Sequence, residues 1–109
     1  MSVSDADIAG AVEHFEALGD ITTRKMMGGL CLYCDGTIFA LLHSDGRLHI
    51  KAQTPEMISR LEGMGSTRWT YQRAGKAPVG MPYWSLPDAA LDDPELACDL
   101  ARDTLKDLA

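Results

Sequence analysis

Two cysteines, Cys31 and Cys34, stand three positions apart directly before an Asp-Gly pair. This spacing can bring two thiolates to one zinc ion where the chain turns tightly between them. On a regular strand, residues three apart face opposite sides, and only Cys98, His43 and His49 remain to complete a ligand set. We therefore interpret the pair as small apolar strand residues, with metal or redox chemistry as the alternative, and expect no cofactor.

The remaining polar residues do not form a recognisable catalytic motif. His43 lies beside a turn and His49 on the polar side of an expected strand, so both are interpreted as solvated side chains. No serine or cysteine lies in a nucleophile motif, and nothing assembles a catalytic triad. We expect a protein that is not an enzyme.

A second chemistry is open to the cations near the middle of the chain. Arg24, Lys25 and Lys51 could gather near Arg73 and Tyr83 and donate hydrogen bonds to a carboxylate or phosphate. The alternative is a solvated rim of the sheet. The complete set of candidate partner-binding or ligand-binding residues is Arg24, Lys25, Met26, Gly28, Gly29, Lys51, Arg73 and Tyr83.

The glycine pair Gly28-Gly29 does not fit a phosphate-binding loop, because it precedes an expected strand and not a helix. We expect a bulge or a close backbone approach there. Methionines are usually core fillers, but a cluster of them around the Arg-Lys segment would make an adaptable surface for a protein partner. Trp69 and Trp84 are interpreted as core aromatics.

Composition limits the classes of function. The 109 residues are enough for one domain, residues 1–109, with a single core. The net charge of −6 opposes binding to a polyanion, so direct nucleic-acid binding is not expected. The first residues carry acids where a secretory signal has basic residues, the three cysteines are an odd number, and the apolar run Ile38 to Leu42 is too short to span a bilayer. We expect a cytoplasmic protein with no membrane segment.

The segment from Arg24 to Lys51 should organise the fold. Its two Asp-Gly pairs, Asp35-Gly36 and Asp45-Gly46, separate apolar runs and predict tight hairpin turns, hence a three-stranded antiparallel meander. The middle run, 38–42, is apolar on both faces and should be a covered central strand. The third alternates apolar and polar residues, so one of its faces should meet water.

Helices should flank this meander. Ser4, Thr54 and Asp93 are expected N-caps, and the first helix should run to Leu18 with Gly19 as its C-terminal cap. Two further strands are expected at 67–73 and 79–86, the latter an edge or bulged strand because of Gly80 and Pro82. The order of helix, three strands, helix, two strands and helix predicts an α+β fold with helices on a mainly antiparallel sheet.

An ordered set of motifs extends from about Phe15 to about Leu96. They are G-D-x-T-x-R-K-M-x-G-G from Gly19 to Gly29, Y-x-D-G from Tyr33 to Gly36, F-A-L from Phe39 to Leu41, D-G-R-L-x-x-K from Asp45 to Lys51, and later Y-x-R, M-x-Y-W and D-D-P elements. With these motifs the sequence resembles the N-terminal domain of the TfoX/Sxy family, known for regulators of bacterial natural competence. The longer regulators continue into a C-terminal domain, so we expect a stand-alone copy of the N-terminal domain.

The resemblance implies a fold of the type III secretion-chaperone-like class and a role in regulating transcription through protein contacts. Our leading hypothesis is a non-enzymatic regulatory or interaction module, with a protein partner that could be the transcription machinery and with self-association as a homodimer through an exposed sheet or helix face. The alternative is a domain that binds a small anionic ligand between Arg24, Lys51, Arg73 and Tyr83.

Overall fold

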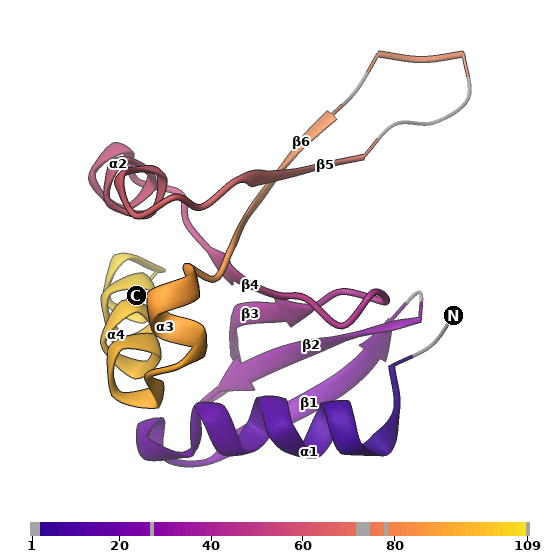
Figure 1. The fold of residues 1–109 in the computed structure, drawn as a ribbon, viewed down its shortest axis with the longest axis vertical. Helices are drawn as coiled ribbons and strands as arrows, with labels where there is room; N and C mark the ends of the chain where they lie inside the picture. Colours follow the sequence, from indigo (N-terminus) through magenta and orange to yellow (C-terminus); the bar gives the residue numbers. More distant parts are fainter. Residues whose placement is uncertain (1–2, 27, 72–74, 78, 109) are drawn as a thin grey trace.

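The computed structural model describes residues 3–26, 28–71, 75–77 and 79–108. The chain forms an α+β fold with helices on an antiparallel sheet, as the sequence predicts (Figure 1). The sheet has six strands and not the five expected, and the helices lie on one side of it. The elements in chain order are α1 (Asp5–His14), the 3-10 helix η1 (Glu16–Leu18), β1 (Ile21–Met26), β2 (Gly29–Cys34), β3 (Thr37–Leu42), β4 (Leu48–Lys51), α2 (Pro55–Gly63), β5 (Arg68–Tyr71), β6 (Val79–Ser85), α3 (Asp88–Leu91) and α4 (Pro94–Leu108).

The strands lie in the order β1-β2-β3-β4-β6-β5, so β1 and β5 are the two edges of the sheet. The first four strands follow one another as a meander. Strand β6 pairs with β4, and β5, which precedes β6 in the chain, lies outside it. In Figure 1 the hairpin of β5 and β6 projects away from the body formed by the meander and the helices.

The two faces of the sheet differ in what covers them. On one face, strand residues such as Leu32 and Ile50 pack with helix residues such as Ala11 and Leu100 to form the main core. The other face holds a smaller cluster around Cys31, Leu41 and Tyr83, and its members all come from strands. The core therefore lies between sheet and helices, while the opposite face is covered by strand side chains alone.

The predicted three-stranded meander is wrong by one strand. The run that begins at Arg24 belongs to a separate strand, β1, and the chain turns back between Met26 and Gly29, which pair directly. Gly28 has φ 81°, a turn conformation that suits glycine. Gly28 thus lies in a turn and Gly29 begins β2, so the glycine pair is not a bulge, whereas the shift in the β2–β3 register lies between Leu32 and Tyr33.

The two Asp-Gly pairs form different turns. Asp35 and Gly36 have φ 51° and 82°, the signs that a type I′ turn requires, so this prediction is confirmed. Asp45-Gly46 lies in the longer loop between β3 and β4, in which the His43 amide donates to the Arg47 carbonyl at 2.8 Å. The middle strand is buried on both faces at residues 39–42, as predicted.

The N-caps follow the sequence. Ser4 Oγ accepts from the Asp7 amide, Thr54 Oγ1 from Met57 and Asp93 Oδ1 from Glu95. The first helix is shorter than predicted, because α1 ends at His14 and the chain continues as η1 before Gly19, which has φ 115°. The short helix α3 was not predicted. No helix in the described part of the chain is both long and apolar enough to cross a membrane.

Strand β6 is bulged and is not an edge. It pairs with β4 on one side and with β5 on the other. Its register against β5 shifts between Arg68 and Thr70, so that extra residues of β6, including Pro82, are accommodated there. Proline has no amide hydrogen to donate, and a bulge lets a paired strand contain it.

Candidate functional site

The segment that the sequence marks as a candidate partner surface is the exposed edge strand β1. It pairs with β2 over six successive residue pairs without a register shift, and within the described chain no strand lies on its other side. Residues 22–26 are all exposed. The Val3 amide donates to the Gly28 carbonyl at 2.9 Å and ties the start of the chain to the turn after β1. The edge is therefore regular, anchored and open.

Arg24 and Lys25 lie on opposite faces of this edge. Arg24 is opposite Cys31, on the face without helices, and Lys25 is opposite Leu30, whose side chain belongs to the main core. Successive strand residues alternate in direction, so neither cation can support the other at one small ligand. In the described part of the chain, neither takes part in an ion pair, whereas Arg60 pairs with Asp103 across α2 and α4.

Met26 and the glycines complete the segment. Met26 is 47% exposed and is one of two large hydrophobic side chains left in the open among the described residues. Gly29 is buried, and a Cβ added to it would lie 2.5 Å from the Leu42 carbonyl oxygen. The predicted close backbone approach is therefore present, and it lies between the start of β2 and the last residue of β3.

Lys51 and Tyr83 lie directly opposite each other on β4 and β6. Burial raises the pKa of Tyr83 to about 12, so its phenol stays protonated at neutral pH. The row that contains Arg24 crosses β2 and β3 before it reaches β4, a separation of about 14 Å at the usual strand spacing. Arg73 lies outside the described residues. The structure thus joins Lys51 to Tyr83 but places Arg24 across the buried side chains of Cys31 and Leu41.

The cysteines are buried strand and helix residues. Cys31 belongs to the cluster on the open face and Cys34 to the main core, so the two thiols point to opposite sides of β2. Burial raises the pKa of the Cys31 thiol, although the charge of Arg24 acts in the opposite direction. The described residues include no group of three or more His, Cys, Asp or Glu side chains that could hold a metal ion.

An aromatic cluster formed by His43, His49, Trp69 and Tyr83 was not predicted from the sequence. Trp69 packs edge-on against His43 with ring centroids 5.2 Å apart, and it lies 6.4 Å from His49 and 6.3 Å from Tyr83. The prediction that His49 is solvated is wrong, because this residue is only 7% exposed. The strand alternation placed His49 on the right face but could not show that Trp69, distant in sequence, would cover it.

Burial also sets the chemistry of this histidine. Loss of solvent lowers the pKa of His49, although the Arg47 carbonyl, 3.2 Å from Nδ1, favours the protonated form. A neutral, buried imidazole that contacts a tryptophan is suited to packing. The aromatic cluster therefore fixes β5 to the middle of the sheet and is separate from the β1 edge.

The protein-family model for the TfoX N-terminal domain matches residues 13–108 of the chain. This chain belongs to the TfoX N-terminal domain family. The match covers the whole β1 edge and the aromatic cluster, so both are parts of the TfoX-type domain. No curated protein matches the chain.

Proposed function

We propose that this TfoX-type domain is a non-enzymatic regulatory module that works through protein contacts, and that the segment from Arg24 to Gly29 forms part of its partner surface. The observation that carries the proposal is the pair of exposed cations on β1, which take part in no ion pair within the described chain although the protein has a net charge of −6. Exposed charges that lack a partner in their own chain are available to another molecule.

A solvated rim is the competing interpretation, and the surroundings of other cations weigh against it. Arg102 pairs with Asp99 at 3.0 Å and Arg47 lies 4.0 Å from Asp45, so acids neutralise these two exposed cations, whereas Arg24 and Lys25 have no such acid within the described chain. The β1 edge instead concentrates two positive charges beside an exposed methionine. Such a combination of charge and adaptable apolar surface suits a protein partner.

The resemblance to competence regulators supports a role in controlling transcription. The net negative charge makes direct contact with DNA a poor route, so we propose that the module acts on a protein of the transcription machinery and can also associate with a second copy. Cytoplasmic location belongs to the same proposal.

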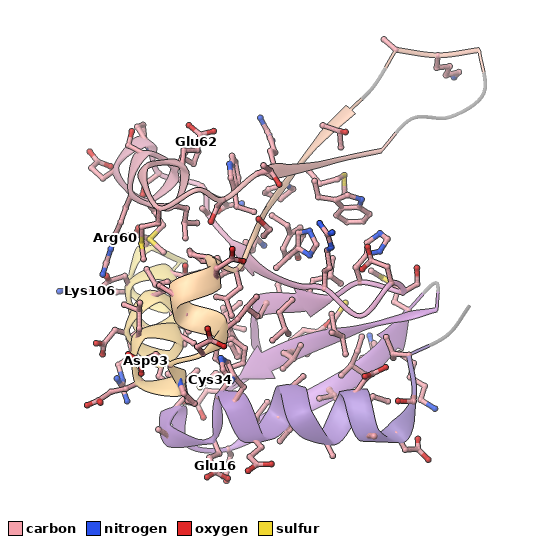
Figure 2. The ribbon with its side chains drawn as sticks, viewed as in Figure 1. Glu16, Cys34, Arg60, Glu62, Asp93 and Lys106 are labelled. Carbon is pink, nitrogen blue, oxygen red and sulfur yellow. The ribbon has the colours of Figure 1, made fainter. Side chains whose placement is uncertain are left out.

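The proposal is tested by affinity capture from the host lysate with the tagged protein, with and without nuclease. The R24A/K25A variant is compared with R60A/K106A, which removes the same charge from α2 and α4, on another side of the molecule (Figure 2). We expect a nuclease-resistant protein partner that R24A/K25A loses and R60A/K106A keeps. Equal capture by both variants would contradict the assignment of the surface, and a nuclease-sensitive signal would contradict the protein-contact mechanism.

The pairing of Lys51 with Tyr83 favours a second candidate function, binding of a small anionic ligand on the open face. Lys51 supplies positive charge, and the phenol of Tyr83, which is 9% exposed, stays protonated. A ligand that binds only the native state must raise its stability. We expect such a ligand, found in a thermal-shift screen of carboxylates and phosphates, to lose its effect in K51A, and a screen without stabilisation would remove this candidate.

A further inference from the structure

The proposed partner surface on β1 is also an unpaired sheet edge, and this inference rests on the proposed function and specifies how the partner binds. We propose that β1 receives an extended acidic segment of a partner protein as an additional strand of the sheet. Main-chain hydrogen bonds to the edge would supply affinity, and side chains at alternate positions would supply specificity.

The backbone of β1 is suited to strand addition. All six of its residues pair with β2 in an unbroken register, so the amides and carbonyls that point away from β2 form an equally regular row. Natural proteins usually protect such an edge with a bulge, a proline, a covering loop or charged side chains. In the described part of the chain the charges of Arg24 and Lys25 are the only such device on β1, and residues 22–26 are exposed.

The charges on β1 select the chemistry of the added strand. Directly opposed residues on paired strands have Cβ atoms about 5 Å apart, so an acidic side chain opposite Arg24 would meet it on the open face. The next residue of the added strand would meet Lys25 on the helix-covered face. Two consecutive acidic residues are therefore the best match, with an apolar residue beside them to cover Met26.

The same charges disfavour a second copy at this edge. In a symmetric antiparallel pairing of two β1 strands that overlaps residues 22–26, the Arg24 side chains of the two copies would lie directly opposite each other. Like charges opposite each other on paired strands are destabilising. The homodimer expected from the sequence would therefore use another surface, and β1 would stay available to an acidic segment.

The probe for this mode is the labelled peptide Ac-VTLEEVT-NH2, titrated with the full chain at low salt and followed by fluorescence anisotropy. Charge reversal is tested in R24E/K25E, with R60E/K106E as the matched control and a peptide with two lysines in place of its glutamates. We expect R24E/K25E to lose affinity for the acidic peptide by at least about tenfold and to gain it for the lysine peptide. R60E/K106E breaks the ion pair of Arg60 with Asp103, so its fold is first verified by thermal unfolding, and the folded variant should bind both peptides as the wild type does.

Backbone pairing is separated from charge attraction by two N-methylated versions of the acidic peptide. One carries methyl groups on the amides of its odd positions and the other on those of its even positions, so each blocks one edge of the peptide strand. We expect one version to lose affinity by at least about tenfold and the other to retain it. Equal binding of both versions would overturn strand addition, as would no binding of the acidic peptide at millimolar concentration.

The two proposals fail in different ways. If lysate capture depends on Arg24 and Lys25 but the acidic peptide gives no edge-specific binding, the partner surface stands and strand addition is overturned. If the peptide binds in the expected manner but no lysate protein depends on these cations, the edge accepts acidic strands and the regulatory function is overturned.

Discussion

The two edges of the sheet are finished in different ways. Edge strand β5 is four residues long, and its register with β6 shifts between Arg68 and Thr70. The guanidinium of Arg68 donates to the Met81 carbonyl at 3.0 Å and lies 4.9 Å from the Trp84 ring centroid. Edge strand β1 is six residues long and unshifted, and within the described chain Arg24 and Lys25 make no side-chain hydrogen bond or cation–π contact of this kind.

This difference shows how an edge can be protected without being closed. A short, bulged strand with a folded-back side chain offers little backbone for pairing with any other chain. On β1 the only barrier visible in the described residues is positive charge, which repels a cationic strand and attracts an acidic one. Protection by charge is thus selective, and it leaves β1 as the edge on which a partner can pair.

The largest expected effects come from the glycines beneath the two edges. A Cβ at Gly29 would meet the Leu42 carbonyl oxygen at 2.5 Å, and one at Gly80 would meet only the flexible end of Arg68. We expect G29A to lower the free energy of unfolding by about 1–3 kcal/mol because backbone must move. The loss in G80A should stay below about 1 kcal/mol because a side chain can move instead. Urea denaturation of both variants measures the difference. Equal losses of unfolding free energy would mean that the backbone around Gly29 can adjust as easily as the Arg68 side chain.

Truncation of Arg68 should weaken the β5 edge of the sheet. We expect R68A to cost about 1 kcal/mol, because both the hydrogen bond to Met81 and the contact with the Trp84 ring are lost. R47A is the control, since its side chain is 76% exposed and should contribute little to stability. Urea denaturation compares them. A loss in R68A no greater than in R47A would show that Arg68 does not close the β5 edge.

Mild acid should weaken the β5 side of the molecule through His49. Burial lowers the pKa of His49 from its ordinary 6.5, so below that pH the unfolded chain binds a proton that the native chain excludes. Its contribution to stability is therefore constant above 6.5 and falls as the pH drops below it. We expect H49Q to reduce the loss of stability between about pH 7.5 and about pH 5.5, measured by urea denaturation at both values. An unchanged pH dependence in H49Q would contradict the burial of a neutral imidazole.

The smallest effect on stability is expected at the open edge itself. Residues 22–26 are exposed and Arg24 and Lys25 form no ion pair in the described chain, so R24A/K25A should change the free energy of unfolding by less than about 0.5 kcal/mol. Chemical denaturation checks this value. A larger loss would show that the two cations support the fold, and any loss of a partner in this variant would then need another explanation.

Local signals were enough to predict much of the fold. Capping residues Ser4, Thr54 and Asp93 lie where their side chains accept the expected amides, and Asp35-Gly36 makes the expected turn. Each of these depends on a few neighbouring residues. Strand β1 was missed as a separate element because its residues are exposed on both faces and leave no alternation of apolar and polar positions.

The candidate site was predictable as a segment but not as a geometry. Arg24 and Lys25 were named from the sequence, but their positions on opposite faces of an edge depend on how β1 pairs with β2. The strand order likewise separates Arg24 from Lys51, a distance that no local pattern encodes. His49 is buried because Trp69 on β5 packs near it. This contact joins residues distant in sequence and also depends on the strand order.

The most direct test of the open edge is amide hydrogen exchange, resolved by residue, with and without saturating Ac-VTLEEVT-NH2. A strand added to β1 would hydrogen-bond the outward amides of residues 21–26, which should then exchange more slowly, while β5 at residues 68–71 should not change. Slowing at β5, or binding of the peptide without any slowing at β1, would contradict the claim that β1 is the edge on which a partner pairs.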